Sequence, residues 1–567
     1  MDLSGYSSLG EMLFHALSKN TDSPALIEAD RDRESAVYTY GDMRRVVSTL
    51  THALESRVSP GGHVAILMSN QSKWLLCASA IFWRGGVLVP LDYKLTPAEQ
   101  IDLLTHSEAK VLFIEFPVYF RILREKYSFP PDVRIIVTEA PSKEKIAHER
   151  FEDLLSKAEA PEVTVAKKSR DDVACIVYSS GTGGTPKGCM LTHGNYLSQA
   201  QVLGTMFPIK PEDRYFSVLP TNHAIDFMCG FLLPLQFGSA IVHQRTLRPE
   251  YLATTMKKYG ISHMALVPLL LKAFERKIKS ELDAQPEWKR ALVNAMMKVN
   301  RVVTARRPCH AFSKRLFAPI HEAFGGKLKL LFAGGAFVDA SMAEFFYSIG
   351  LPVVIGYGLT EAGTVLTVND LRPFRSDTVG KAIEGTTVEL RDLNDQRIGE
   401  VWVQGPTIMK GYFKEPQLTE DAIVHGWLKT GDLGTVESSG HVKLLGRSKN
   451  MIVTEGGKNI YPEDVEASFE SLDSAAEVCV FSSSYLWRGT SLTKEKLLMV
   501  VHAKDATEQS QVIAEIKERN HRLADYKRID AILFWNKDFP RTASMKIKRN
   551  VLAEELKMQD ANSIVEV

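Results

Sequence analysis

The sequence lacks a run of apolar residues long enough to cross a membrane, and it lacks the features of a secretory leader. Its longest apolar run, residues 228–242, is interrupted by Gln236 and falls short of the roughly 20 residues that a spanning helix needs. We expect this run to form a buried helix and strand. The first residues, MDLSGYSSLGEMLF, contain neither a basic segment nor a long apolar one. We therefore expect a cytoplasmic protein.

Cysteine is scarce, and neither sign of charge is in excess. The six cysteines show no CxxC spacing and no histidines placed for zinc, so we expect buried thiols in a reducing compartment. The 69 Lys and Arg residues balance 68 Asp and Glu residues, which excludes a global attraction to nucleic acid or to anionic membranes. With 567 residues, 45% of them hydrophobic, the chain is expected to form two or more domains.

From about residue 8 to residue 370, apolar runs alternate with amphipathic segments, as in α/β proteins. The runs are almost continuously apolar, which is typical of parallel strands covered on both faces. Helices are predicted between them, for example over 97–107 after Thr96-Pro97 and over 340–349 after Asp339. The clearest predicted strands are 63–70, 86–92, 109–115, 133–139, 263–269, 328–335 and 351–358.

After residue 378 the pattern changes to short alternating runs separated by Gly, Asn and Asp, which indicates an antiparallel β subdomain. A smaller α+β pattern follows residue 446. We predict an α/β fold with a large N-terminal domain, 1–447, of mixed and mostly parallel sheets plus this small antiparallel subdomain. A small mobile α+β C-terminal domain, 448–567, completes the prediction.

Residues 284–316 form a basic amphipathic segment. A solvated helix face is one interpretation, and peripheral contact with a membrane surface or docking of a partner is the other.

The most informative motif is VACIVYSSGTGGTPKGCMLTHGN, residues 173–195. Two apolar runs flank a loop rich in Gly, Ser and Thr, which predicts a hairpin whose tip is suited to binding phosphate through backbone N–H groups, hydroxyls and Lys187. A Walker loop would need Gly before the lysine and Ser or Thr after it, but Pro186 and Gly188 stand there. This disfavours a P-loop kinase or ATPase, and a flexible surface hairpin is the remaining alternative.

The segment SSGTGGTPKG resembles the signature loop of the adenylate-forming superfamily, which includes acyl-CoA synthetases, peptide-synthetase adenylation domains and beetle luciferases. The family commonly has a second Thr where this chain has Gly183. The resemblance implies that ATP phosphates are bound by Ser179, Ser180, Gly181, Thr182, Gly183, Gly184 and Lys187.

The segment GYGLTEAG, residues 356–363, resembles the next motif of that superfamily. The resemblance implies that Tyr357 stacks on adenine, that Thr360 meets the α-phosphate and that Glu361 binds Mg²⁺. An aromatic face, a hydroxyl and a carboxylate at a strand end make chemical sense for this role. Without the resemblance, the segment could be a strand followed by a turn.

Two further segments match in the family's order. KTGDLG resembles the element whose Asp, here Asp432, binds the ribose hydroxyls, although an Asp between glycines is often only a turn former. GRSKNMIVTEGGKNIYPEDVE resembles the junction between the two domains. It implies that Arg447 contacts the nucleotide, that Lys449 is the hinge, and that Gly456 and Gly457 line the passage for the thiol.

The C-terminal segment PRTASMKIKRN resembles the motif that carries the family's catalytic lysine, and Lys546 matches it. Met545 stands where the family usually has Gly, which restricts the backbone. Lys548 lies close enough to be tested as an alternative. A lysine in a basic tail is otherwise a solvated side chain.

LPTNHAIDFMCG resembles the segment that lines the acyl pocket, which implies that His223 lies near the substrate carboxylate and Phe227 in the pocket. A lone His is otherwise a structural residue. Adenylation domains for α-amino acids carry an Asp where this chain has Ala224, so a buried substrate ammonium would have no partner here. Gly334 and Gly335 are predicted to leave room for the acyl group.

Together these motifs predict a stand-alone acyl-CoA synthetase of the AMP-forming type that uses ATP, Mg²⁺ and coenzyme A, with a medium- or long-chain fatty acid as the favoured substrate. The long connection through 284–316 into GGKLKLLFAGGA is similar to that of medium- and long-chain fatty acid synthetases. The alternatives are an aryl acid-CoA ligase, an acyl-AMP ligase that loads a carrier protein, a luciferase-like oxidase and a catalytically silent nucleotide-binding protein. The sequence does not determine the oligomeric state.

Overall fold

The computed structural model describes residues 2–156, 162–179, 186–453, 459–469, 472, 475–486, 496–503, 509–541, 547–558 and 564–567. The chain divides into two compact units. Among the described residues, unit 1 comprises those within 2–179, 186–387 and 404–428, and unit 2 comprises those within 388–403 and 429–567. The predicted boundary after residue 447 therefore lies inside unit 2, and the predicted hinge at Lys449 stays a prediction.

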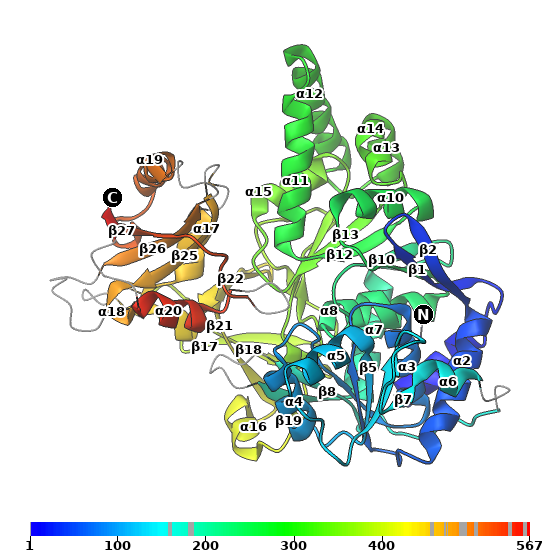
Figure 1. Cartoon of the computed structure of the whole chain (residues 1–567). Helices are drawn as coiled ribbons and strands as arrows, with labels where there is room; N and C mark the ends of the chain where they lie inside the picture. The colour runs from blue at the N-terminus through cyan, green and yellow to red at the C-terminus, as the bar shows by residue number, and fades with distance from the viewer. Residues whose placement is uncertain are drawn as a thin grey trace. The chain divides into compact units, whose positions relative to one another are not determined.

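A nine-stranded sheet, sheet A, forms one half of unit 1 (Figure 1). Its central strands are parallel, and helical crossovers join β10, β11, β12, β13 and β14 in succession, while β2, β15 and β16 pair antiparallel at the edges. In spatial order the strands are β16 (Lys381–Ala382), β15 (Thr367–Val368), β14 (Val353–Tyr357), β13 (Leu330–Gly334), β12 (His263–Leu266), β10 (Arg214–Ser217), β11 (Ala240–Gln244), β1 (Pro24–Asp30) and β2 (Arg33–Thr39).

An eight-stranded sheet, sheet B, forms the other half of unit 1. Its strands β4, β3, β5, β6 and β7 pair in parallel, and β8 pairs antiparallel with β9. In spatial order they are β19 (Gly411–Tyr412), β9 (Lys187–Thr192), β8 (Val173–Ser179), β4 (Val87–Pro90), β3 (His63–Leu67), β5 (Val111–Glu115), β6 (Arg134–Thr138) and β7 (Glu149–Arg150). Strands β3 to β6 and β12 to β14 confirm the seven strands predicted from apolar runs.

The helices of unit 1 cover these sheets and bury apolar side chains against them. In the core of sheet A, strand residues pack against α10, α11 and α15, and in the core of sheet B they pack against α4 and α5. The helices are α1 (Leu9–Leu17), α2 (Tyr40–Glu55), α3 (Ser72–Trp83), α4 (Pro97–His106), α5 (Phe116–Arg124), α6 (Phe151–Ser156), α7 (His193–Met206), α8 (Ala224–Phe227), the π-helix η1 (Met228–Leu232), α9 (Leu233–Phe237), α10 (Pro249–Tyr259), α11 (Pro268–Asp283), α12 (Glu287–Thr304), α13 (His310–Leu316), α14 (Ala318–Ala323), α15 (Ala340–Ser348), the 3₁₀ turn η2 (Thr360–Ala362) and α16 (Pro416–Ala422).

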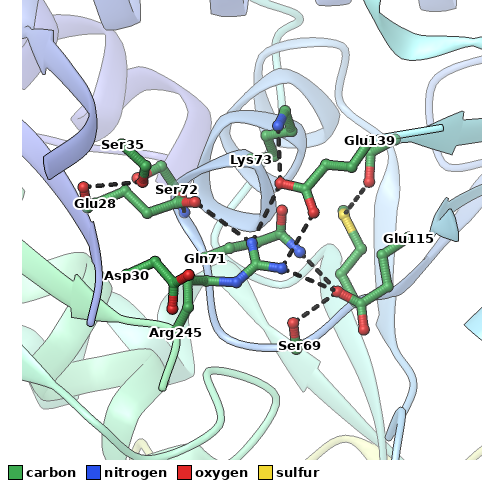
Figure 2. A network of polar contacts seen from close by, with 12 residues as sticks. Glu28, Asp30, Ser35, Ser69, Gln71, Ser72, Lys73, Glu115, Glu139 and Arg245 are labelled. Atoms are coloured by element: carbon green, nitrogen blue, oxygen red, sulfur yellow. Dashed lines mark hydrogen bonds and ion pairs between the residues drawn. The ribbon is translucent and has the colours of Figure 1, made fainter. Parts of the chain in front are cut away.

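Sheets A and B are joined by a largely buried network of charges centred on Arg245, just after β11 (Figure 2). Its guanidinium donates to both carboxylate oxygens of Glu139, at 3.2 and 3.1 Å, and lies 3.4 Å from Glu28 of β1. Glu115, at the end of β5, lies 3.9 Å from Arg245, and Lys73 donates to Glu139 at 3.0 Å. The network thus ties residues of sheet A to the strand ends of sheet B.

The pKa values of the network's carboxyl groups shift in opposite directions. Arg245 and Lys73 together outweigh burial and lower the pKa of Glu139. Burial raises the pKa of Glu115, which accepts hydrogen bonds from Ser69 at 2.6 Å and from the Gln71 side chain at 2.8 Å. Removing either cation would leave buried carboxylates without compensation.

Unit 2 contains an antiparallel sheet and a four-stranded mixed sheet. The antiparallel sheet has the order β17–β18–β21–β22, and the mixed sheet has the order β25–β26–β27–β28. Their elements, with the short ones between them, are β17 (Thr387–Arg391), β18 (Gly399–Gln404), β21 (Trp427–Val436), β22 (Val442–Arg447), the 3₁₀ turn η3 (Ser448–Asn450), β23 (Ile452–Val453), β24 (Asn459–Ile460), α17 (Pro462–Ser468), β25 (Ala475–Ser482), α18 (Ser483–Leu486), β26 (Leu497–Ala503), α19 (Gln509–Asn520), the 3₁₀ turn η5 (Asp525–Lys527), β27 (Ala531–Trp535), α20 (Arg549–Lys557) and β28 (Val565–Glu566). The short strand β20 (Ile423–Val424) belongs to unit 1. The predicted α/β class with a small antiparallel sheet is confirmed.

Within the described part of the chain, no helix combines the length and the apolar character required to cross a membrane. The run 228–242 forms η1, α9 and the start of β11, as predicted for a buried helix and strand. All six cysteines are free, five of them are buried, and Cys309 is exposed.

Candidate active site

The two apolar runs that flank the glycine-rich segment form the paired strands β8 and β9 of unit 1, as the sequence predicts. Strands β8 and β9 pair up to Ser179↔Lys187, so these two residues face each other at the base of the loop. Thr192 ends β9 and caps α7, because its hydroxyl accepts from the backbone N–H of Asn195 at 3.1 Å while the Asn195 side chain accepts from Thr192. The other predicted phosphate-binding residues, Ser180, Gly181, Thr182, Gly183 and Gly184, lie outside the described residues.

Glu361 lies at the centre of a polar cluster beside this hairpin. The segment 356–363 leaves sheet A at Tyr357, the last residue of β14, and forms the turn η2 that carries Thr360 and Glu361. A carboxylate oxygen of Glu361 accepts from the hydroxyl of Tyr412 at 3.1 Å and from that of Ser179 at 3.4 Å. The structure therefore brings together the end of the phosphate loop and the predicted Mg²⁺ ligand.

Tyr412 was not identified from the sequence. It lies in β19, which pairs with β9, and the Lys187 ammonium is 5.2 Å from the centre of its ring. The preceding loop is held by Asn195, whose side chain donates to the backbone oxygens of Pro406 at 2.7 Å and Ile408 at 3.0 Å. Because Tyr412 is separated from Lys187 and Glu361 by long stretches of chain, only the folded structure reveals the cluster.

The donor set of this cluster fits Mg²⁺. Glu361 offers a carboxylate, Ser179 a hydroxyl, and both are hard oxygen ligands of the kind that Mg²⁺ prefers. Glu361 is half-buried, and its backbone oxygen accepts a hydrogen bond from the N–H of Met409 at 2.8 Å. Glu361 and Ser179 would hold a Mg²⁺ ion here, which would supply positive charge to the site.

The segment LPTNHAIDFMCG, predicted to line the acyl pocket, and Thr360, predicted to meet the α-phosphate, line one small apolar pocket of unit 1. His223 precedes α8 as its N-cap residue, and Phe227 ends that helix. Phe227 is buried, and its ring centre lies 4.9 Å from that of Tyr196. The pocket is lined by Pro90, Val177, Leu191, Tyr196, Asn222, Ala224, Phe227 and Thr360, none of which carries a charge.

Gly334 and Gly335 lie at the end of β13, and the space beside them is partly filled by Ile225. A Cβ atom on Gly334 would lie 2.9 Å from the backbone oxygen of Gly356 and 3.2 Å from Cδ1 of Ile225. Gly335 has φ +81° and a Cβ there would lie 4.0 Å from the same methyl group. Glycine at 334 therefore permits the close approach of β13 and β14, and Ile225 limits the room that was predicted for an acyl group.

Asp226 holds the acyl segment in place. Its fully buried carboxyl group accepts from Ser217 at 2.7 Å, Thr221 at 2.9 Å and Tyr215 at 3.3 Å. Asn70 of sheet B joins the cluster, because its side chain accepts from Thr221 at 2.7 Å and donates to Ser217. Burial raises the pKa of Asp226 to about 7, against the lowering effect of the three hydroxyls.

The two predicted nucleotide contacts of unit 2 form an ion pair. Asp432 and Arg447 are register partners in β21 and β22, and Nε of Arg447 lies 2.7 Å from the Asp432 carboxylate. Asp432 lies within a strand rather than in the turn that its glycine neighbours suggested; Gly431, with φ +70°, bends the backbone just before it. Lys449 is exposed in η3, directly after β22.

Lys546, Gly456 and Gly457 lie outside the described residues, but the residues that flank Lys546 up to Arg541 and from Ile547 are described. Arg541 and Ile547 form an antiparallel bridge, and the N–H of Lys548 donates to the backbone oxygen of Pro540 at 2.7 Å. Ion pairs of Arg541 with Glu477 and of Arg549 with Glu466 anchor these flanking residues further.

Comparison with known proteins gives one family and several related enzymes. The model of the AMP-binding enzyme family matches residues 13–413. The long-chain-fatty-acid–CoA ligase FadD15 of Mycobacterium bovis is 26% identical over 88% of this chain and 87% of its own. The 3-[(3aS,4S,7aS)-7a-methyl-1,5-dioxo-octahydro-1H-inden-4-yl]propanoyl:CoA ligase of Rhodococcus jostii is 28% identical over 92% of this chain and 94% of its own. The crystal structure of the anthranilate CoA ligase AuaEII with anthranoyl-AMP has a TM-score of 0.78 at 21% identity and covers 98% of this chain and 99% of that one.

Because the family match extends over most of the chain, the protein belongs to the AMP-binding enzyme family. The resemblance to adenylate-forming enzymes is confirmed, and AuaEII confirms the fold. The predicted enzyme class, an AMP-forming acid–thiol ligase, is confirmed by the family and by the relatives that are CoA ligases.

Proposed function

We propose that the protein activates a medium- or long-chain fatty acid with ATP, through an acyl-AMP intermediate, and transfers the acyl group to coenzyme A. The observation that carries the proposal is the uncharged pocket in which Ala224 and Phe227 lie with Thr360, beside the Glu361 cluster. An apolar acid with its carboxylate near Thr360 would direct its chain toward uncharged side chains, so no charge would be left unpaired. The fatty acid ligase among the relatives supports the same class of substrate.

An α-amino acid is disfavoured as substrate because no acidic side chain lines the pocket. Asp226 is the nearest carboxyl group along the segment, but Tyr215, Ser217 and Thr221 already hydrogen-bond to it. A substrate ammonium in this pocket would therefore be buried without a partner, at a cost of several kcal/mol.

In the first half-reaction, a carboxylate oxygen of the acid attacks the α-phosphorus of ATP and the bond to pyrophosphate breaks. We infer that Lys187 and Lys546 neutralise charge on the phosphates, that the loop glycines donate backbone N–H groups, and that the Thr360 hydroxyl donates to the α-phosphate. Mg²⁺ held by Glu361 would supply further positive charge. Tyr357 would stack on adenine, and His223 would lie near the carboxylate.

In the second half-reaction, the thiol of coenzyme A attacks the acyl-AMP carbonyl and AMP leaves. Lys546 has no role in this step, so we infer that the C-terminal segment rotates about Lys449 and exchanges Lys546 for a passage formed at Gly456 and Gly457. The paired side chains of Asp432 and Arg447 would hold the ribose and the AMP phosphate through both steps. A substitution Lys449→Pro should then slow thioester formation more than adenylation.

A panel of fatty and aryl acids with ATP, Mg²⁺ and coenzyme A, scored by AMP formation, tests the proposal. Medium- or long-chain fatty acids should give the highest kcat/KM. Faster turnover with aryl acids would instead identify an aryl acid-CoA ligase, and transfer to a holo-carrier protein but not to coenzyme A would identify an acyl-AMP ligase.

The assignment of Lys546 has its own test, with Lys548 as the matched control. K546A should abolish adenylation yet leave thioester formation from supplied acyl-AMP largely intact, because the lysine acts only on ATP. K548A should retain both steps. Equal loss of both half-reactions in K546A, or loss of adenylation in K548A, would contradict the assignment.

A further inference from the structure

Helix α12 carries an exposed apolar stripe. Trp288, Leu292, Val299, Val302 and Val303 are 64%, 52%, 50%, 77% and 57% exposed. Because an α-helix repeats every 3.6 residues, these positions fall on one face over the full length of α12. Figure 1 shows α12 extending away from the strands of sheet A. Five large apolar side chains gathered on one exposed face indicate an interaction surface rather than scattered surface residues.

The opposite face of α12 is fixed, so the stripe cannot turn toward the core. Asn300 is fully buried, and its side chain donates to the backbone oxygens of Ser348 at 3.0 Å and Tyr347 at 3.3 Å at the end of α15. Ser313 of α13 donates to the Asn300 side chain at 2.8 Å. The residues of α12 that pack against the core of sheet A are Val293, Met296 and Met297. The orientation of the outer face is therefore set by specific contacts.

Basic side chains surround the stripe. Lys289 and Lys298 are exposed along its two edges, and Arg306 and Arg307 are exposed just after the helix ends. In the segment 284–316, eight Lys and Arg residues accompany one acidic residue, Glu287, which gives a net charge of +7 against +1 for the whole chain. The segment is thus strongly basic in a chain whose total charge is nearly neutral.

We propose that the outer face of α12 docks on an anionic lipid surface. An apolar stripe with a Trp near one end and Lys and Arg at its edges matches helices that lie in the plane of a membrane, where the apolar side chains enter the acyl boundary and the cations meet the headgroups. Each cation near an anionic surface strengthens binding. The proposal concerns α12 alone and does not depend on which acid the enzyme activates.

A second copy of the chain is a poorer occupant of this face. A two-fold contact would place the same patch of each copy together, so two strongly basic segments would face each other. Nucleic acid is also a poor match, because the centre of the face is apolar and a phosphate backbone would need cations there. An anionic lipid surface satisfies both the stripe and its basic edges.

Flotation of the full-length protein with lipid vesicles tests the proposal. We expect the protein to partition about tenfold or more in favour of phosphatidylcholine vesicles containing phosphatidylglycerol over phosphatidylcholine alone, and to lose this preference at high salt. The double variant L292E/V302E should weaken partitioning at least tenfold, because it removes apolar burial and adds negative charge. K289Q/K298Q should weaken binding to the anionic vesicles only.

Leu393→Glu provides the matched control, since Leu393 is 54% exposed in unit 2 and lies outside the stripe. Its partitioning should equal that of the wild type, and unchanged melting temperatures should show that all variants are folded. Absence of wild-type binding to the anionic vesicles, or equal binding by L292E/V302E, would overturn the proposal. The proposal would also be overturned if the wild type formed a dimer that does not bind vesicles and that dissociates in the L292E/V302E variant, because a second copy would then occupy the stripe.

Discussion

The buried carboxyl group of Asp226 makes a defined prediction for the pH dependence of stability. Its pKa is raised from 3.8 to about 7 in the folded chain, chiefly by burial. Because the pKa is raised in the folded state, the favourable contribution of Asp226 to the free energy of folding is complete below pH 3.8 and is lost as the pH rises through 7.

The magnitude follows from the pKa shift. Between pH 5 and pH 8 the Asp226 carboxyl is ionised throughout in the unfolded chain, but in the folded chain it ionises only near pH 7. At 1.36 kcal/mol per pKa unit, about 2.5 kcal/mol of folding free energy is therefore lost over this pH range. Unit 1 has roughly 400 residues, for which this energy corresponds to about 3 °C in melting temperature. Asp226→Asn keeps the shape of the protonated carboxyl and does not titrate.

Differential scanning fluorimetry of wild type and D226N across this pH range measures the effect. The melting temperature of D226N relative to wild type should rise by about 3 °C from pH 5 to pH 8. Asp213→Asn is the matched control: Asp213 is also buried, but its hydrogen bond with Lys329 at 2.5 Å helps to lower its pKa, so its carboxyl is already ionised at pH 5. A constant offset between D226N and wild type at every pH would refute the reasoning.

Three further substitutions test the network, the acyl pocket and the metal ligand. Arg245→Met should destabilise unit 1 by about 3–5 kcal/mol, and by less at low pH, where the carboxylates become protonated. Arg45→Met, which breaks an exposed ion pair, should destabilise it by under about 1 kcal/mol. Equal melting temperatures of the two variants would contradict this expectation. Ile225→Ala should shift kcat/KM toward longer or bulkier acids by about tenfold, because it clears the space beside Gly334; an unchanged acid profile would argue that Ile225 does not limit the pocket. Glu361→Gln should lower kcat by about a hundredfold or more and raise the Mg²⁺ concentration needed for half-maximal rate, with no loss of melting temperature; an unaltered Mg²⁺ titration would exclude it as a metal ligand.

The sheets of unit 1 could be predicted from the sequence because their parallel strands are short, nearly continuous apolar runs bounded by polar residues. The hairpin of β8 and β9 and helix α15 were predictable for the same local reasons, since a glycine-rich loop and the N-cap residue Asp339 act within a few residues. The strand position of Asp432 was not predictable in this way. Its glycine neighbours suggest a turn, but pairing with Arg447 on β22 keeps the segment extended.

The parts of the site that escaped prediction depend on contacts between distant residues. Tyr412 reaches Glu361 only because β19 pairs with β9, and Thr221 links Asp226 to Asn70 only because the two sheets pack together. The network of Arg245 likewise combines side chains from five separate segments. None of these residues stands in a local pattern that distinguishes it from a solvated polar residue.

The most direct test of the central claim is acid-dependent exchange of labelled pyrophosphate into ATP in the absence of coenzyme A. An adenylate-forming enzyme must catalyse this exchange, because the first half-reaction is reversible and needs no thiol. We predict exchange that requires Mg²⁺ and a fatty acid, that is lost in K546A and that persists in K548A. Failure of every fatty and aryl acid to support exchange, or release of ADP instead of AMP, would contradict the account.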